Sequence, residues 1–233
     1  DVLIENYKPS TLRAWGVADA REICARHPRL VHCRITGFGD DGPLGGLPGY
    51  DAAVQAAAGL MAVNGEAGGP PLRLGLPVVD MATGMQAAIA VLAALQERHA
   101  SGRGQLCDVA LYDCALGLAH PHVVNHLWSG QEPARLGNGH PNVVPYDAFE
   151  TANGRVYIAV GNDRQFALLC AELGLPGLAQ DARFRGNPQR IAHRDALMAQ
   201  LVPALAAADG PALAERLLAR GVPAAPVQGI GLA

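Results

Sequence analysis

The first half of the chain alternates short, mainly apolar runs with segments that repeat their apolar positions every three or four residues. Residues 2–4 and 30–35 predict two buried strands, and the helical pattern of residues 18–26 lies between them. Residues 106–109 predict a third strand. Because strands and helices alternate in this way in βα units, the pattern predicts an α/β fold with a mainly parallel sheet.

Two further segments of this half predict helices. Residues 51–63 have the pattern of a helix capped by Asp51, and the glycine- and proline-rich loop at 64–75 ends it. Residues 112–128 predict one more continuous helix.

Asp80 stands where the apolar pattern changes its period. Residues 76–80 predict a short apolar strand that ends at Asp80. Residues 83–99 are rich in alanine and apolar on every side, which predicts a helix that is buried all round. Asp80 is therefore expected at the junction of a strand and a long helix.

The pattern changes after residue 128. Residues 146–150 and 156–160 flank an Asn153-Gly154 turn and predict an antiparallel hairpin. Three helical patterns follow, at residues 164–173, 191–207 and 211–220. This arrangement predicts a small α+β domain.

The chain therefore divides into a large α/β domain at residues 1–128, a Gly/Pro-rich linker and active-site loop at 129–145, and a small α+β domain at 146–233. It opens at Asp1 on a strand pattern already under way. We therefore expect an incomplete, Rossmann-like parallel sheet and an internal piece of a longer protein.

Composition narrows the possible functions. Half of the 233 residues are hydrophobic and 17% are charged, which is typical of a soluble protein with a substantial core. The 18 lysines and arginines are scattered and the net charge is −3, so the chain does not have the basic stripe that a nucleic-acid partner requires. The apolar stretch at residues 87–95 is too short to span a membrane, and the expected location is the cytoplasm.

Asp80 is the strongest candidate for chemistry. One interpretation is an aspartate that caps the following helix, whose N–H groups and dipole favour a negative charge. The other is a carboxylate nucleophile at the carboxyl edge of a sheet, where open α/β folds bind ligands. The two are compatible, since an ionised carboxylate can attack a thioester carbonyl and form a mixed anhydride.

Two further patterns in the sequence do not support a metal site or a nucleotide cofactor site. His120, His122 and His126 lie close together, but no carboxylate or thiol nearby completes the four ligands of a closed site, so no metal is predicted. No GxGxxG follows a strand, so a nicotinamide site is not supported.

Several short motifs, in one order along the whole chain, resemble those of the class III coenzyme A transferases of the CaiB/BaiF type, with formyl-CoA transferase-like character. They lie at residues 1–9, 37–39 with Gly42 and Pro43, 48–51, 75–80 with Gly84, 102–105, 135–138 with His140 and Pro141, 159–163, and 221–227.

The resemblance implies roles for single residues. Asp80 matches the aspartate that forms acyl anhydride and aspartyl-CoA thioester intermediates in the family. Asn6 matches a residue near CoA, Tyr7 an aromatic residue that packs against it, and Tyr50 a tyrosine in the active-site wall.

A glycine-containing loop and two cations near the first strand are further candidates for the site. The segment Gly137-Asn138-Gly139 resembles the glycine segment that shields the intermediates, although an ordinary connecting loop would have a similar composition. Lys8 and Arg13 follow the first strand and are plausible contacts for the CoA phosphates, although solvated surface charges are the commoner explanation for any one of them.

The resemblance predicts an enzyme that transfers CoA from an acyl-CoA donor, with succinyl-CoA suggested, to a small carboxylic acid. The CoA thioester would be a substrate, with no tightly bound cofactor, and the family's interlocked homodimer is expected. One alternative is an acyl-CoA racemase of the same fold, but racemases carry histidine where this chain has Tyr50, and tyrosine is a poor base at neutral pH. The other alternative is a non-catalytic module of a truncated chain.

Overall fold

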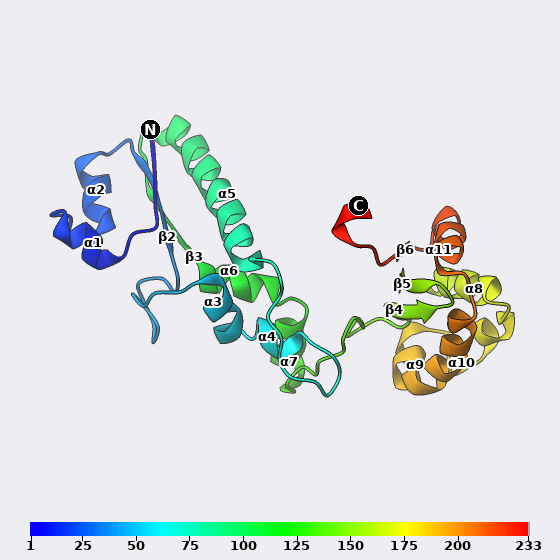
Figure 1. The fold of residues 1–233 in the computed structure, drawn as a ribbon. Coiled ribbons are helices and arrows are strands. Elements are labelled where there is room, and N and C mark those ends of the chain that lie inside the picture. Colours follow the sequence, from blue (N-terminus) through cyan, green and yellow to red (C-terminus); the bar gives the residue numbers. More distant parts are fainter. Residues whose placement is uncertain (233) are drawn as a thin grey trace. The chain divides into compact units, whose positions relative to one another are not determined.

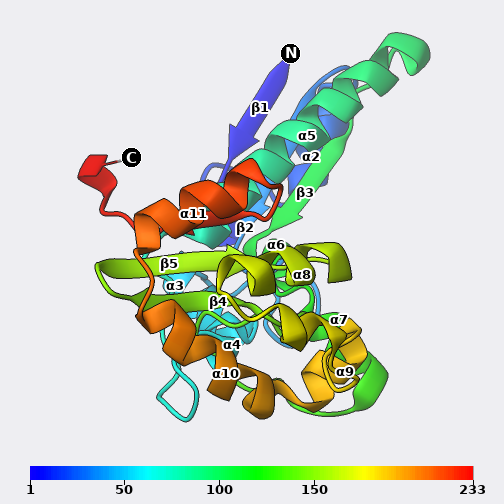
Figure 2. The same ribbon diagram turned by 90° about the vertical axis from the view of Figure 1, so that its right-hand side faces the viewer.

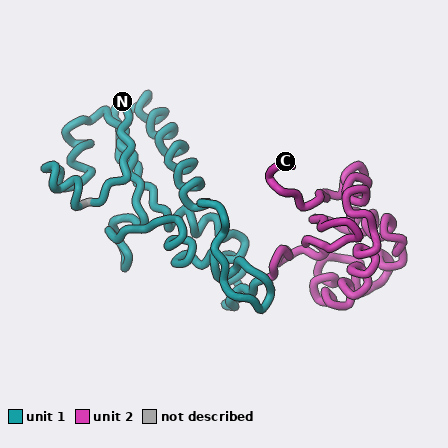
Figure 3. Tube along the Cα trace, in the orientation of Figure 1, with its two compact units in different colours: residues 1–135 teal, residues 136–233 magenta. Residues whose placement is uncertain are grey.

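The computed structural model describes residues 1–232, which form a mixed α/β protein (Figures 1 and 2). The chain forms two compact units, Asp1–Arg135 and Leu136–Ala233 (Figure 3). Each unit has its own sheet and its own hydrophobic core. The boundary between them falls within residues 129–145.

The first unit is built on a parallel sheet. Its strands, in spatial order, are β1 (Val2–Glu5), β2 (Val31–Thr36) and β3 (Leu106–Ala110). Val2 pairs with Val31, and Cys33 pairs with Cys107. Together with the separate antiparallel sheet of the second unit, this confirms the predicted α/β class.

Helices cover both faces of this sheet. The helices of the unit are α1 (Pro9–Ala14), α2 (Ala20–Arg26), α3 (Asp51–Ala57), α4 (Leu60–Val63), α5 (Val78–Ser101), α6 (Leu111–Leu118) and α7 (His122–Ser129). Figure 1 shows α2 on one side of the strands and α5 on the other. Because side chains alternate along a strand, Val31 and Cys33 of β2 pack against α5, while His32 and Arg34 face the opposite side.

The start of α5 corrects one prediction. No strand forms at residues 76–80, because α5 begins at Val78 and Asp80 lies in its first turn. The β-branched Val78 and Val79 resemble a strand in sequence, but Val79 is fully buried against α3 and α6, and this packing overrides their local preference. Pro77 precedes the first turn, a position where its missing N–H costs no helical hydrogen bond.

The predicted burial of α5 on every side is also wrong. One face packs on the sheet through Ala87, Val91 and Ala94. Within the described residues, the opposite face leaves large apolar side chains exposed, and these are Met81, Met85, Ile89 and Leu92. Alanine-rich composition therefore did not distinguish the buried face from the exposed one.

Two helices predicted as continuous are broken. Gly59, with a φ of 81°, separates α3 from α4, a conformation that residues with a side chain rarely adopt. Pro121 separates α6 from α7, since proline cannot donate the next helical hydrogen bond. Asp51 is not the cap of α3 either, because Tyr50 occupies that position and Asp51 is the first helical residue.

The second unit is built on an antiparallel sheet of β4 (Tyr146–Thr151), β5 (Gly154–Ala159) and β6 (Ala224–Pro226). Tyr146 pairs with Ala159 and Thr151 with Gly154, as the predicted hairpin requires. The short β6 was not predicted, because the prolines around it are typical of a loop.

Helices pack on this second sheet. They are α8 (Asp163–Glu172), η1 (Pro176–Gln180), α9 (Asn187–Ala192), α10 (Arg194–Ala206), α11 (Gly210–Ala219) and η2 (Ile230–Leu232). The core contains Ile158, Phe166, Leu201 and Leu217. The helix predicted at residues 191–207 is divided at His193 into α9 and α10.

By length and composition, α5 could cross a membrane, and so could α10 and α11 if this bent pair counted as one span. The core helix of a soluble protein has the same properties, and α5 packs against β2 and β3. This feature by itself therefore does not assign the chain to a membrane.

Candidate active site

A cavity of about 460 Å³ lies in the first unit at the carboxyl ends of the parallel strands. Its wall is formed by residues that follow β1, by the loop that follows β2, by Leu111 after β3 and by the start of α5. Asn6, Tyr7, Tyr50 and Asp80 all line this cavity. Four of the predicted site residues, distant in sequence, are thus brought together at the sheet edge where open α/β folds bind ligands. Their individual roles stay predictions.

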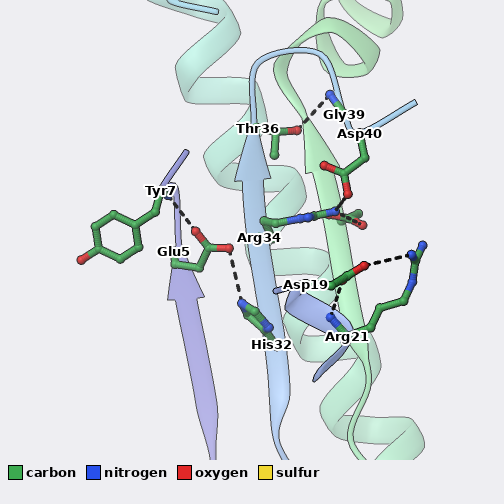
Figure 4. Close-up of polar contacts among 10 residues, drawn as sticks. Glu5, Tyr7, Asp19, Arg21, His32, Arg34, Thr36, Gly39 and Asp40 are labelled. Carbon is green, nitrogen blue, oxygen red and sulfur yellow. Dashed lines mark hydrogen bonds and ion pairs between the residues drawn. The ribbon is translucent and has the colours of Figure 1, made fainter. Parts of the chain in front are cut away.

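The turn after β1 is held by a buried carboxylate. Glu5 accepts a hydrogen bond from the backbone N–H of Tyr7 (2.7 Å) through Oε2 (Figure 4). Its other oxygen, Oε1, lies 3.5 Å from Nε2 of the buried His32 on the neighbouring strand. The ring of Tyr7 meets Trp15 edge to face, with centroids 4.9 Å apart. These contacts fix the main chain that presents Asn6 and Tyr7 to the cavity.

The loop after β2 is held by an ion-pair network on the sheet face opposite α5. Arg34 donates to both carboxylate oxygens of Asp108 on β3 (2.6 and 2.7 Å) and to Asp40 of the loop (2.6 Å). Burial disfavours the charge of Arg34, but these hydrogen bonds outweigh burial and raise its pKa. Gly39 donates to Oγ1 of Thr36 (3.0 Å), as Figure 4 also shows. Arg34 thus ties the cavity loop to two strands.

Two glycines let this loop fold back on itself. A Cβ atom on Gly37 would lie 2.5 Å from the backbone nitrogen of Gly49, closer than side chains tolerate. Both glycines line the cavity, and Tyr50 follows directly, with 85% of its surface exposed. The close approach of the two backbone segments therefore shapes the cavity wall beside Tyr50.

Asp80 projects from the first turn of α5 and is exposed toward the cavity. It is not a helix cap as one interpretation held, because the N–H groups of Val79 and Asp80 donate to Asp51 Oδ2 (2.9 and 3.1 Å). Partial desolvation, and then the negative charge of Asp51, raise the pKa of Asp80. The helix terminus alone was expected to favour ionisation, and the opposing carboxylate of Asp51, 29 residues away in the chain, could not be foreseen from the local pattern.

A second cavity of about 400 Å³ shares Tyr7, Lys8 and Asp40 with the first. Arg13 and Arg34 line it as well. The two cations predicted to contact phosphate, Lys8 and Arg13, are therefore brought together here. Among the described residues that line the first cavity, Lys8 is the one cationic side chain.

The segment Gly137-Asn138-Gly139 belongs to the second unit, whereas Asp80 and both cavities belong to the first. The hydroxyl of Tyr157 donates to the carbonyl oxygen of Asn138 (2.9 Å), and Gly139 donates to that of Leu136 (2.9 Å). The segment is therefore hydrogen-bonded within its own unit.

The next residue, His140, is also held in place. It stacks on Tyr146, its Nδ1 accepts from Asn142 N (3.0 Å), and its carbonyl oxygen accepts from Arg194 (3.0 Å). Burial, followed by the charge of Arg194, lowers the pKa of His140, so its neutral form is favoured. Sequence spacing gave no sign of this arrangement.

Sequence reasoning missed other site residues as well. Polar side chains interrupt the mainly apolar strands β2 and β3 at His32, Arg34 and Asp108, and this was the signal that could have revealed the network. No group of three or more histidine, cysteine, aspartate or glutamate residues within residues 1–232 could hold a metal ion.

The sequence profile of CoA-transferase family III matches residues 1–232. The chain belongs to CoA-transferase family III. This confirms the resemblance found in the sequence motifs.

Relatives of this family III chain agree with that assignment. It is 42% identical to a succinate–glutarate CoA-transferase of Agrobacterium fabrum, over 83% of this chain and 48% of the relative. It is 37% identical to a succinyl-CoA:mesaconate CoA-transferase of Haloarcula marismortui, over 98% of this chain and 58% of the relative. A CaiB/BaiF family crystal structure from Brucella suis shares 39% identity with a TM-score of 0.78, over 99% of this chain and 61% of that one. The family III chain thus spans about half the length of the curated relatives it matches.

Proposed function

We propose that the protein transfers CoA from an acyl-CoA donor to a small carboxylic acid, with the Asp80 carboxylate as the covalent carrier. The observation that carries this proposal is the cavity that gathers Asn6, Tyr7, Tyr50 and Asp80 at the carboxyl edge of the sheet. Family membership supports it, since the relatives described above are named as CoA-transferases.

The reaction needs no proton donor and no cofactor. An Asp80 oxygen attacks the acyl carbon of the donor, the C–S bond breaks, and CoA leaves as a thiolate from a mixed anhydride. The thiolate then attacks the Asp80 carbonyl and releases the donor acid, which leaves an aspartyl-CoA thioester. The acceptor carboxylate attacks this thioester to form a second anhydride, and the released thiolate takes the acceptor acyl group. Each step exchanges one anion for another, and Asp80 ends as it began.

The surrounding residues would bind the substrate. Asn6 and Tyr7 would contact CoA near the thioester, and Tyr50 would form the wall beside the acyl group. Lys8 and Arg13, which line the second cavity, would contact CoA phosphates, because cations at this position would stabilise the phosphate charge. A shielding role for Gly137-Asn138-Gly139 rests on the family resemblance alone and stays a prediction.

The substrates, the assembly and the location of the protein are also proposals. We infer succinyl-CoA as donor and a small dicarboxylate as acceptor, in agreement with the names of the glutarate and mesaconate transferases. The interlocked homodimer rests on the family resemblance and the cytoplasmic location on the sequence pattern, and both stay predictions.

The transfer rate should fall on acidification, because only ionised Asp80 attacks. Since desolvation and the charge of Asp51 raise the pKa of Asp80, we expect the acidic limb of kcat to lie above the range of an ordinary aspartate. Measuring kcat against pH at saturating substrates would test this. A rate that stays constant down to the ordinary aspartate range would contradict it.

The experiment that tests the proposed function uses the full natural chain that contains these residues. Purified protein is incubated with acetyl-CoA, formyl-CoA or succinyl-CoA and with a panel of mono- and dicarboxylic acids, and new thioesters are identified by mass spectrometry. Transfer from succinyl-CoA to a dicarboxylate is the expected result. A parallel incubation in deuterated water without any acceptor acid tests the racemase alternative, which deuterium entering the α carbon of the acyl-CoA would indicate. No reaction in either incubation would favour a non-catalytic module.

A further inference from the structure

The long helix α5 begins without a capping side chain of its own. The first N–H groups of a helix have no partner within the helix, and the residue before α5 is Pro77, which has no side-chain acceptor. The acceptor comes from α3, where Oδ2 of Asp51 accepts hydrogen bonds from the backbone N–H groups of Val79 and Asp80. A buried side chain of one helix therefore caps another at the residue proposed to carry the acyl group.

Gln55 holds Asp51 in this position. It lies one turn later on α3 and is fully buried. Its Nε2 donates to Asp51 Oδ1 (2.6 Å), and its Oε1 accepts from the backbone N–H of Leu74 (3.0 Å). Gln55 therefore orients the carboxylate and also holds the chain that leads into α5.

The first turn of α5 is thus fixed from two sides. Val79 is fully buried in the core between α3 and α6, and its N–H and that of Asp80 are bound to Asp51. A helical turn held in this way has one orientation, which exposes the Asp80 side chain to the cavity. Small displacements of a nucleophile reduce rates strongly, because reaction requires the attacking atom in a near-attack position.

We propose that Asp51, held by Gln55, is a positioning residue for the transfer reaction, acting through the first turn of α5 to aim the Asp80 carboxylate. This inference rests on the proposed role of Asp80. Asp51 also acts through its charge, because its anion lies beside Asp80 and contributes to the raised pKa there. A higher pKa makes the Asp80 carboxylate a stronger nucleophile in its deprotonated form.

The test is Asp51→Asn in the full natural chain. Asparagine keeps the size of the side chain but is neutral and has one carbonyl oxygen in place of two carboxylate oxygens. We expect kcat to fall about 10- to 100-fold, while KM for acyl-CoA stays within about twofold because no CoA contact is removed. The acidic limb of kcat should move to lower pH, since the charge that raises the Asp80 pKa is gone.

A matched control separates positioning from ordinary capping. Asp209 caps α11 in the second unit by accepting the N–H of Ala212 (3.0 Å). Asp209→Asn also neutralises a helix-capping carboxylate, but it should change neither kcat nor the pH profile. If Asp51 were merely structural, Asp51→Asn would lower thermal stability but leave kcat and the pH profile unchanged, as Asp209→Asn does.

Gln55→Met gives a second test if Asp51→Asn does not fold. Methionine has a similar volume and cannot hold Asp51 or Leu74, so kcat should fall with KM unchanged, while the acidic limb stays in place because Asp51 keeps its charge. Wild-type kcat in the folded Asp51→Asn protein, or in Gln55→Met where the first does not fold, would overturn the positioning role. If Asp80→Ala is inactive at the same time, the proposed function stands; if Asp80→Ala keeps its activity, the proposed role of Asp80 as carrier fails.

Discussion

Asp80→Ala is expected to abolish CoA transfer and leave the fold of the first unit intact. Alanine removes the carboxyl group on which both covalent intermediates would form, so kcat should fall on the order of 10⁴-fold or more. The side chain is exposed, and its backbone N–H stays bound to Asp51. Loss of a first-turn acid costs about 0.3–1 kcal/mol, and relief of the repulsion from Asp51 acts in the opposite direction.

Three measurements check this prediction. Steady-state assays give the rate, calorimetry with a CoA thioester gives the affinity, and thermal unfolding gives the stability. The affinity should remain close to that of the wild type, because the proposed CoA contacts at Asn6, Tyr7 and Lys8 are untouched. An alanine variant that keeps more than a few per cent of the wild-type rate would show that another residue is the carrier.

Gly37→Ala should damage the cavity loop severely. The new methyl group would lie 2.5 Å from Gly49 N and 2.7 Å from Gly49 Cα, and both are backbone atoms that a rotamer change cannot move. The two segments of the loop must therefore separate, and overpacking of this kind costs about 1–3 kcal/mol. Because Gly37, Gly49 and Tyr50 line the cavity, acyl-CoA binding should weaken as well.

Gly117→Ala is the matched control in the same unit. Gly117 lies within α6, and a Cβ atom there would meet nothing within 4 Å. Since glycine weakens a helix interior, this variant should be more stable by about 0.5–1 kcal/mol. Denaturant unfolding and KM for acyl-CoA would compare the two variants. Equal stability and equal KM would show that the close approach of Gly37 and Gly49 does not shape the site.

Sequence patterns predicted the elements whose signal is local. β2, β3 and the hairpin of β4 and β5 form where the short apolar runs and the Asn153-Gly154 turn predicted them. The sequence also identified Asp80 from its place before a long helix, and motif resemblance then added Tyr7 and Tyr50 as residues of interest.

The errors arose where tertiary contacts decide the structure. Val78 and Val79 resemble a strand until α3 and α6 pack against them, and Asp51 resembles a local cap until its carboxylate is seen bound to the start of α5. The partners of Arg34 were not visible for the same reason, since Asp108 is 74 residues away in the chain. Pairings at such separations follow from strand order, which a single sequence states only indirectly.

Chemical trapping can identify directly the residue that carries the acyl group. The full natural protein would be incubated with acyl-CoA, treated with hydroxylamine or borohydride to convert the activated carboxyl, digested, and analysed by tandem mass spectrometry. The expected result is modification at Asp80, dependent on acyl-CoA and absent from Asp80→Ala. Modification found consistently at Asp40, Asp51 or Asp108 would contradict the assignment of Asp80 as the covalent carrier.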